Sequence, residues 1–295
     1  RGKTEPPFAW LVPSDQPDPR TVVEMLSVLH ATGIEVHKAE NEFFADGVPY
    51  PAGTYVLYCS QPYRAHLNDM MERQVYPDRS SYPGGPPETP YDMAGWTLPL
   101  QMGVRSVSVD QPFEVRAAKL DVVTLPRGKV TESPDMTRGY VVRAGGNDDY
   151  RLANRLFRAG IRFHIIPFQT LWQTVAGMAV PCGSFFIPHT EDIEVELPRL
   201  IDGISTVVTG ISKPYSEVKT ALRSLSSPRV GLYQPWTASM DEGLTRLVLD
   251  NFEFDYTSVH NPEIRAGHLR DRYDCLVLPS ISSSSIMNGR GVDTT

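Results

Sequence analysis

Short apolar runs alternate with longer amphipathic segments along this chain. Residues 10–12 form the first apolar run. Asp18 and Pro19 then open a segment in which apolar side chains recur every three or four residues, and Gly33 follows its last turn. An aspartate at the N-cap, a proline in the first turn and a glycine after the last turn are typical boundaries of a helix. The pattern predicts a strand, a helix and a second strand.

The same pattern occurs twice more, so the chain contains an internal repeat. The second copy has a helix capped by Asn147 or Asp148 and closed by Gly160, and the third has a capping-box pattern at Ser239 and Glu242. Residues 29–37 match 156–164 at an offset of 127, and residues 9–12 and 50–56 match 139–142 and 180–186 at an offset of 130. The third copy is shorter and comprises 230–233, 256–260 and 273–279. Its helix has an apolar stripe of Leu244, Leu247 and Val248.

A helix between two apolar strands is a βαβ unit, and its crossover makes the two strands parallel. Three such units predict a doubly wound α/β fold of repeated βαβ units. The chain starts without Met and stops soon after a Ser-rich stretch, so we expect an excerpt from a longer protein. The expected organisation is a tandem α/β region over 1–225, with copy one at 8–75 and copy two at 136–225, and the start of a third, truncated α/β domain at 226–295.

A segment rich in proline and glycine, residues 76–103, interrupts the repeat. Proline removes a backbone donor and fixes φ, so this segment predicts a long ordered loop rather than a helix, with Trp96 and several tyrosines as anchors. Loops of this length are usually functional or form an interface. Weak alternation of apolar and polar residues over 104–130 then predicts a small antiparallel insertion. The loop and the insertion together occupy residues 76–135.

Composition limits the classes of function. The 295 residues predict about two domains, and a 41% hydrophobic share is enough for packed cores. The 28 Lys and Arg against 35 Asp and Glu give a net charge of −7 with no basic block, which argues against nucleic acid as a partner. No apolar run approaches the roughly 18 residues of a membrane span. Cys59, Cys182 and Cys275 form no CxxC pair, which excludes a cysteine-based zinc ribbon.

One motif resembles the metal-ligand pattern of a zinc carboxypeptidase. His37 and Glu40 form an HxxE pair, and His164 would be the third ligand. Asn154-Arg155 matches a pair that holds a substrate carboxylate in such enzymes. The spacing favours another interpretation, because the separation of the two histidines in sequence equals the repeat offset. The histidines are then one position in two copies of one unit, and we assign no metal ligand and no catalytic residue in this chain.

Two further motifs have structural interpretations that we favour. Cys182 could be a nucleophile on a tight turn, but Ala52 fills the same place in copy one, and alanine has no nucleophilic group. Gly145-Gly146 lies between a strand and a helix, where anions bind, but Asp148 and the acidic residue after it would repel phosphate. A tight turn explains the glycine pair.

The strongest candidate surface is the loop between strand and helix in the third copy. Gln234, Trp236 and Asp241 offer hydrogen-bonding groups and an aromatic face there, and Ser14 lies in the matching loop of copy one. Open α/β sheets bind ligands at the carboxyl ends of their strands, so these four residues are the candidate ligand-binding residues. The alternative is helix capping and turn formation by the same loops.

Two long strings resemble a known family. Residues 82–104 contain YPGGPP, then PYD and GWTLPLQMGV, and residues 229–243 read RVGLYQPWTASMDEG, followed by LRDRYD at 269–274. Both resemble the region that follows the catalytic domain in large bacterial proteins of the M14 zinc-carboxypeptidase family. The resemblance covers nearly the whole chain. It implies tandem α/β domains that are flavodoxin-like or similar to class I glutamine amidotransferases.

The resemblance also locates the chemistry outside this chain. It implies that zinc and the catalytic residues belong to a domain preceding Arg1, and that an amidotransferase-type cysteine would follow the strand that ends at Pro279, beyond the last residue. No cofactor is therefore expected in this chain. The parent proteins resembled are often exported, which implies a periplasmic or secreted location.

We therefore expect a non-catalytic accessory region that packs on the upstream catalytic domain of the same polypeptide and shapes access of a peptide substrate, with residues 76–103 as the contact. One alternative is an amidotransferase-like hydrolase or transferase that uses Cys182. Another is a module that binds a small ligand through the loops at Ser14 and Trp236.

Overall fold

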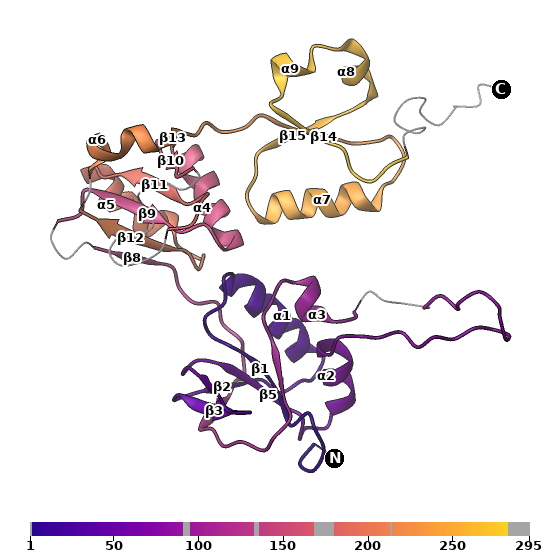
Figure 1. Cartoon of the computed structure of the whole chain (residues 1–295). Coiled ribbons are helices and arrows are strands. Elements are labelled where there is room, and N and C mark those ends of the chain that lie inside the picture. Colours follow the sequence, from indigo (N-terminus) through magenta and orange to yellow (C-terminus); the bar gives the residue numbers. More distant parts are fainter. Residues whose placement is uncertain (1, 91–94, 133–135, 168–179, 213, 283–295) are drawn as a thin grey trace, which may run out of the picture. The chain divides into compact units, whose positions relative to one another are not determined.

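The protein has a mixed α/β fold, as predicted (Figure 1). The computed structural model describes residues 2–90, 95–132, 136–167, 180–212 and 214–282. Residues 91–94 of the Pro-rich loop, 168–179 and 213 of copy two and 283–295 of the third copy lie outside the described residues. The chain divides into two compact units, Arg1–Pro126 and Arg127–Thr295, so the boundary expected near residue 225 falls within the second unit.

The first unit is built around copy one. Asp18 caps its first helix as predicted, because the Asp18 carboxylate accepts hydrogen bonds from the N–H groups of Arg20 and Thr21 at 3.1 and 3.3 Å. The elements are β1 (Ala9–Val12), α1 (Pro19–Ala31), β2 (His37–Ala39), β3 (Phe43–Ala45), β4 (Val48–Tyr50), β5 (Tyr55–Tyr58), α2 (Arg64–Met71), α3 (Leu98–Gln101), β6 (Val107–Val109) and β7 (Ala117–Lys119).

The second unit holds copy two and the third copy. The elements of copy two are β8 (Lys129–Thr131), β9 (Gly139–Val142), α4 (Asn147–Arg158), β10 (His164–Ile165), β11 (Phe185–Pro188), α5 (Glu191–Leu200), β12 (Val207–Ile211), α6 (Tyr215–Val218), the 3-10 helix η1 (Lys219–Ala221) and β13 (Arg223–Ser224). The elements of the third copy are β14 (Val230–Tyr233), α7 (Met240–Asn251), β15 (Tyr256–Val259), α8 (Asn261–Ala266), α9 (Leu269–Arg272) and β16 (Cys275–Val277).

The prediction of parallel sheets is wrong for the first two copies. The sheet of the first unit has the order β6-β1-β5-β2-β7, and each neighbouring pair is antiparallel. α1 does connect β1 to β2 as a crossover, but β5 lies between them. The chain reaches β5 from β2 through the β3–β4 hairpin, without a crossover helix, so β5 returns antiparallel.

The repeat itself can be followed residue by residue in the strand pairing. His37 faces Val56 across β2 and β5, and His164 faces Phe186 across β10 and β11. The pairs of β1 with β5 recur in β9 with β11 at a constant offset of 130. Both copies also share a glycine after the first helix, Gly33 at φ 95° and Gly160 at φ 67°. Copy two therefore repeats both the topology and the register of copy one.

The main sheets of the first two copies are apolar on both faces, because side chains on both sides of their central strands are buried. In β1, Trp10 and Val12 pack toward α1, whereas Ala9 and Leu11 pack with the β3–β4 hairpin. In copy two, residues of β9 and β11 pack alternately with α4 and α5 or on the opposite face near Ile166. The core of each of these two copies thus lies on both faces of its sheet.

The strands after the Pro-rich segment extend the two sheets. β6 pairs with β1 and β7 pairs with β2, both antiparallel, at the edges of the first sheet. β8 instead pairs in parallel with β12 in copy two. The antiparallel insertion expected near these residues is therefore part of the sheet of copy one, and its last strand belongs to the second unit.

The Pro-rich segment is an insertion into copy one. In copy one Ala9 faces Tyr58 on one side and Val109 on the other. The equivalent Gly139 of copy two faces Pro188 and Ile211, which follow each other much more closely in sequence. The additional residues of copy one therefore lie between β5 and β6. The prediction of a continuous loop over 76–103 is wrong at its end, because α3 is helical with Pro99 in its first turn.

The insertion follows a helix that both copies share. At the repeat offset of 130, Leu67 and Met71 of α2 match Leu197 and Ile201, and all four side chains are buried. α2 therefore corresponds to α5, and α3 belongs to the insertion. We call residues 75–96 the arm, of which the structure describes 75–90, 95 and 96; Figure 1 shows the chain leaving the unit after α2.

The third copy is the parallel unit that the sequence predicts. β14 lies between β15 and β16 and pairs in parallel with both. α7 connects β14 to β15, and α8 and α9 connect β15 to β16. Figure 1 shows α7 on one side of this sheet and the two shorter helices on the other. A crossover helix in each connection is what makes all three strands parallel.

The predicted apolar stripe of α7 does not face this sheet. Leu244, Leu247 and Val248 are each about half exposed, whereas Glu242 is buried. Arg246 pairs with Glu242, donates to the Ser258 hydroxyl at 3.0 Å and lies over the ring of Tyr256. These polar contacts hold α7 against β15, and the apolar stripe faces outward.

Equivalent glycines in the two copies predict unequal effects of substitution. Gly33→Ala and Gly160→Ala both place a side chain in the left-handed region, which costs about 1 kcal/mol. A Cβ at Gly33 would also lie 2.8 Å from the Tyr63 ring, whereas a Cβ at Gly160 meets nothing within 4 Å. We expect Gly33→Ala to lower the free energy of unfolding more than Gly160→Ala, as measured by urea denaturation of the full chain. Equal losses would show that the Tyr63 ring is not held in place.

Candidate functional site

The structure places three of the four candidate ligand-binding residues near one another in sequence and fold. Gln234 and Trp236 follow β14, and Asp241 is exposed in the first turn of α7. Ser14 belongs to the other unit, where its hydroxyl donates to the Ala52 carbonyl oxygen at 3.3 Å. A site in the second unit is therefore built from the loop after β14, and Ser14 acts as a turn residue in its own copy.

An exposed aromatic platform stands at the carboxyl edge of the third sheet. The Trp236 side chain is 71% exposed, and its ring stacks on His260 with centroids 4.3 Å apart and planes 8° apart. Nδ1 of His260 lies 2.9 Å from the Gln234 carbonyl oxygen, and the Tyr233 hydroxyl donates to the Asn261 side chain at 2.7 Å. These contacts fix the platform at the edge where open α/β sheets bind ligands.

His260 is the platform residue that sequence reasoning missed. The sequence showed it only as the histidine that ends a strand, and nothing in the spacing joins it to Trp236. The stack arises because β14 and β15 are neighbours whose carboxyl ends meet at one edge. The flat face of the tryptophan suits an apolar or aromatic ligand surface.

A second candidate is a pocket of about 790 Å³ in copy two, a volume typical of small-ligand sites. It lies between the end of α4, the start of α5 and the edge strand β13. His164 forms its buried wall, stacked on Tyr215 with ring centroids 4.6 Å apart. The Ser224 hydroxyl lies 3.2 Å from Nδ1 of His164. Asp192 and Glu196 of α5 also line the pocket.

The Ser224–His164 pair has two members of a nucleophile–base–acid arrangement. Burial lowers the pKa of His164, and the positive charge of Arg162 lowers it further, so the imidazole is neutral near pH 7 and can accept a proton. A carboxylate hydrogen-bonded to His164 would complete a triad, and the residues described provide none. The imidazole and the hydroxyl are available to a ligand in this pocket as hydrogen-bonding groups.

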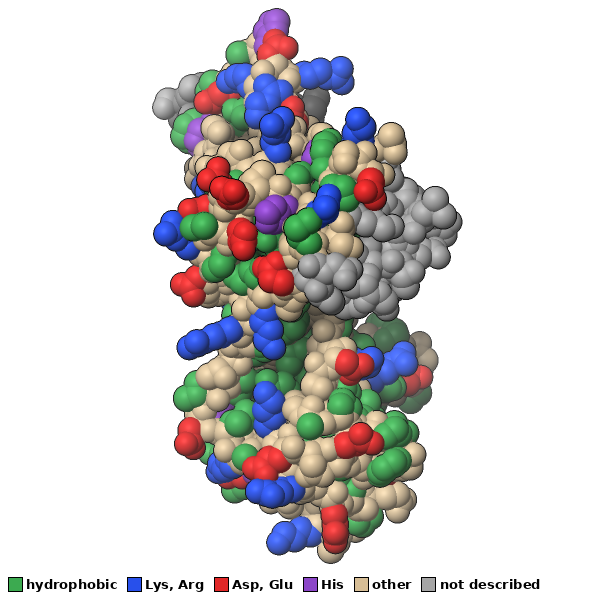
Figure 2. Space-filling model, turned by 90° about the vertical axis from the view of Figure 1, so that its left-hand side faces the viewer, with side chains coloured by type: hydrophobic (Ala, Val, Ile, Leu, Met, Phe, Trp, Pro, Cys, Tyr) green, Lys and Arg blue, Asp and Glu red, His purple; other side chains and the backbone are tan. Residues whose placement is uncertain are grey.

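Acidic side chains gather on α5 beside this pocket. Glu191, Asp192 and Glu194 occupy the first turn, where they stabilise the helix N-terminus, and Glu194 lies 3.5 Å from the His189 ring nitrogen. Figure 2 shows acidic side chains around a histidine on one face of the second unit. A ligand that enters from this side meets negative charge.

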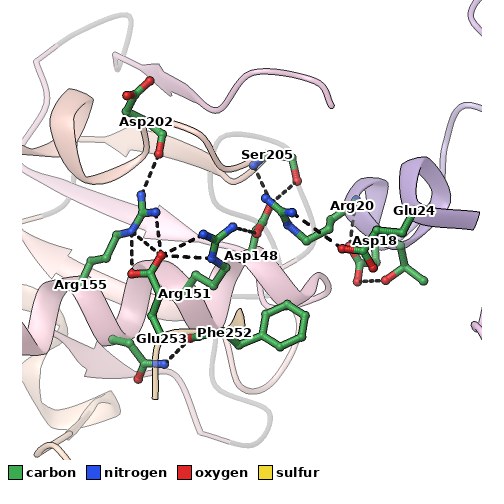
Figure 3. Close-up of polar contacts among 12 residues, drawn as sticks. Asp18, Arg20, Glu24, Asp148, Arg151, Arg155, Asp202, Ser205, Phe252 and Glu253 are labelled. Atoms are coloured by element: carbon green, nitrogen blue, oxygen red, sulfur yellow. Dashed lines mark hydrogen bonds and ion pairs between the residues drawn. The ribbon is translucent and has the colours of Figure 1, made fainter. Parts of the chain in front are cut away.

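The pair Asn154-Arg155 does hold a carboxylate, and the carboxylate comes from this chain. Arg155 donates to both oxygens of Glu253 at 2.8–3.2 Å, and Arg151 also reaches that carboxylate at 2.9 Å (Figure 3). The Asn154 amide donates to the Phe252 carbonyl oxygen at 2.9 Å. The hydrogen bonds from Arg155 lower the pKa of Glu253, and those from Arg151 add to the effect. This cluster joins copy two to the third copy.

Glu253 occupies an unusual backbone position. It follows α7 at φ 60°, the left-handed conformation that Gly33 and Gly160 adopt after the helices of the other copies. A side chain in this conformation costs about 1 kcal/mol. The arginine contacts offset that cost. A glutamate at a position where the other two copies have glycine is the sequence signal that points to the cluster.

The anion-binding interpretation of Gly145-Gly146 is not supported, because the protein fills that place itself. Asp149 accepts hydrogen bonds from the N–H groups of Gly145 and Gly146 at 3.1 and 2.9 Å. The residue that caps α4 is Gly146, so the prediction of Asn147 or Asp148 as the cap is wrong. Asp148 is buried and instead accepts from the N–H and hydroxyl of Ser205.

The three cysteines have different surroundings. Cys182 is exposed in a turn closed by Ser184, whose hydroxyl donates to the Pro181 carbonyl oxygen, and the Thr54 hydroxyl closes the matching turn around Ala52. Burial raises the pKa of Cys59 to about 11, so its thiol is protonated and unreactive. Cys275 is exposed at the start of β16.

The described residues provide no group of three or more His, Cys, Asp or Glu side chains placed to hold a metal ion. His37 lies edge-on to the Tyr58 ring, and Glu40 pairs with Arg116. No described helix is long and apolar enough to cross a membrane. The chain matches no protein-family model, no curated protein and no solved structure.

The Glu253 cluster predicts a difference between two arginines. Arg155→Ala removes the main partner of a carboxylate that is only 20% exposed, so we expect a loss of about 2–3 kcal/mol in the free energy of unfolding of the second unit. The side chain of Arg158 is 44% exposed, and Arg158→Ala should cost below about 1 kcal/mol. Native-state hydrogen exchange of α4 amides measures both. Equal losses would contradict this role of Arg155.

The two equivalent histidines predict a loss of stability in acid. Burial lowers the pKa values of both His37 and His164 in the folded protein. As pH falls below about 6.5, the unfolded chain takes up protons before the folded protein does, so the free energy of unfolding decreases. We expect the urea midpoint to fall between about pH 7.5 and pH 5.5.

The histidine variants identify the source of this loss. The double variant His37→Gln, His164→Gln should show a smaller drop of the urea midpoint over the same pH range, whereas the control His268→Gln, at an exposed position, should keep the full drop. An undiminished drop in the double variant would assign the pH dependence to other groups.

Proposed function

We propose that this chain is a non-catalytic accessory region of an M14-like zinc carboxypeptidase and that the arm is its contact with the catalytic domain. The observation that carries the proposal is the arm itself. It is inserted into one copy of a repeat whose other copy folds without it, so its role lies outside the folding of that unit.

The neck of the arm is fastened to the unit. The Thr97 hydroxyl donates to the Glu72 carbonyl oxygen at 2.9 Å and accepts from the Gln74 N–H at 3.1 Å. Tyr76 and Trp96 stack just beyond, with ring centroids 6.1 Å apart. A fastened neck reduces the entropy lost when the arm docks on a partner.

The tip of the arm is a turn that exposes aromatic surface. The N–H of Gly85 donates to the Tyr82 carbonyl oxygen at 2.9 Å, and the N–H of Glu88 donates to the Arg79 carbonyl oxygen at 2.8 Å. The Tyr82 side chain is 60% exposed at the tip, and at the base of the arm Val75 is 82% exposed. Exposed aromatic side chains on a preformed turn are typical anchors of a protein interface.

In this proposal the catalytic domain binds the zinc and cleaves the peptide, and the arm shapes the approach of the peptide. The resemblance of residues 82–104 to the M14 family supports the choice of partner, because those residues include the tip and base of the arm. The chain's own residues supply docking surface and take no part in the reaction.

A second candidate function is a module that binds a small ligand at the Trp236 platform. The observation that favours it is the parallel stack of Trp236 on His260 at the carboxyl edge of the sheet. The two functions use different units and are compatible.

Deletion of the arm tests the accessory role. In the full-length protein that carries the catalytic domain, we expect removal of residues 76–95 with a short glycine linker to change kcat/KM for a peptide at least about fivefold, a change of about 1 kcal/mol in activation free energy. The point variant Tyr82→Ala should change it in the same direction. Val122→Ala, at an exposed position of the same unit outside the arm, is the matched control.

The kinetic measurements require a parallel measurement of the stability of the first unit. The deletion should leave urea unfolding of that unit unchanged, because copy two folds without an arm. Unchanged peptide kinetics with an intact first unit would rule the proposal out.

A further inference from the structure

The two copies of the repeat differ at one place where copy one is filled and copy two is open. In copy one, the segment after β5 brings Gln61 and Tyr63 against the end of α1. In copy two, the matching place is the pocket beside His164. The segment that fills copy one therefore shows which chemistry the open pocket can accept.

The filling in copy one uses a carboxamide and an aromatic ring. The N–H of Glu35 donates to Oε1 of Gln61 at 2.7 Å, and Nε2 of Gln61 donates to the Tyr58 carbonyl oxygen at 2.7 Å. Gln61 is 9% exposed. The Tyr63 ring lies against Gly33, so close that a Cβ there would be 2.8 Å from it. His66 adds a hydrogen bond to the Thr32 hydroxyl at 3.0 Å.

Each of these contact points has an equivalent that lines the pocket. At the repeat offset of 127, Thr32, Gly33 and Glu35 correspond to Ala159, Gly160 and Arg162. All three equivalents line the pocket. A Cβ at Gly160 would meet nothing within 4 Å, and the backbone N–H of Arg162 has no hydrogen-bond partner among the described residues.

The pocket is open because α5 begins earlier than α2. Thr190 caps α5 through the Ile193 N–H, so the residues that would match Gln61 and Tyr63 are Glu191, which is exposed in the first turn, and Ile193, which is buried in the core. These two residues leave the space against Arg162 and Gly160 open. The remaining wall is the buried His164 with Tyr215 and Ser224.

We propose that this pocket binds a peptide segment that carries a carboxamide side chain followed by an aromatic residue, in the way that Ser60-Gln61-Pro62-Tyr63 fills copy one. The carboxamide oxygen accepts from the Arg162 N–H, and the aromatic ring lies over Gly160. Asp192 and Glu196 line the pocket together with Arg162, so the charges there give an acidic side chain no advantage over the carboxamide. This inference does not depend on the proposed role of the arm.

The test uses the full chain and a peptide copied from copy one, acetyl-Ser-Gln-Pro-Tyr-amide. We expect saturable binding with a dissociation constant on the order of 1 mM, as for a small ligand with few contacts. The backbone amide of Arg162 should shift on titration in a ¹H–¹⁵N NMR spectrum, because it gains an acceptor. The amide of Glu35 already has its acceptor and should not move.

A matched peptide and two variants make the result decisive. Acetyl-Ser-Ala-Pro-Tyr-amide lacks only the carboxamide and should bind at least about tenfold more weakly, a difference of about 1.4 kcal/mol. Ser224→Trp fills the pocket and should abolish the shift at Arg162, whereas Ser227→Trp, exposed and outside the pocket, should leave it unchanged. No shift at Arg162, or equal binding of the two peptides, would overturn the proposal.

Discussion

The organisation of the first two copies depends on one strand that is hydrogen-bonded on both sides. β5 lies between β1 and β2, and β11 lies between β9 and β10, in the same register. A strand in this position fixes which residues of its neighbours face each side, because a slip of one residue would turn every buried side chain to the other face. His37 and His164 therefore hold one position, and so do the turns and glycines around them.

With the backbone fixed in this way, the two copies differ in what is added to it. Copy one has an arm inserted after α2 and a pocket filled by Gln61. Copy two runs from α5 to β12 without an arm and has an open pocket beside His164. Both differences arise in the connection that follows the central strand. That connection lies at the surface, where insertions are tolerated and where binding residues concentrate, so it is where duplicated units can acquire separate roles.

The sequence predicts the repeat, the caps of α1 and α7 and the parallel third sheet, because these follow from short-range signals such as Asp18-Pro19 and Gly33. It does not predict that β5 lies between β1 and β2, because an apolar run of four residues does not indicate which strands it pairs with. Nor does it predict the outward stripe of α7, where the pairing of Arg246 with Glu242 and Ser258 decides which side faces the sheet. Among the candidate residues, Trp236 needed His260, which is remote from it in sequence and stacks on it in the fold.

The Glu253 cluster shows how a departure from the repeat carries information. In the first two copies a glycine follows the first helix in the left-handed conformation, and this conformation at the end of a helix favours glycine. The third copy has Glu253 there, at a conformational cost that only its contacts offset, and those contacts come from α4 of copy two. Because the contacts of this strained residue come from the neighbouring copy, we interpret it as a link between the two copies rather than as a local feature of its own helix end. Copy two and the third copy are therefore linked through a position where the other two copies have glycine.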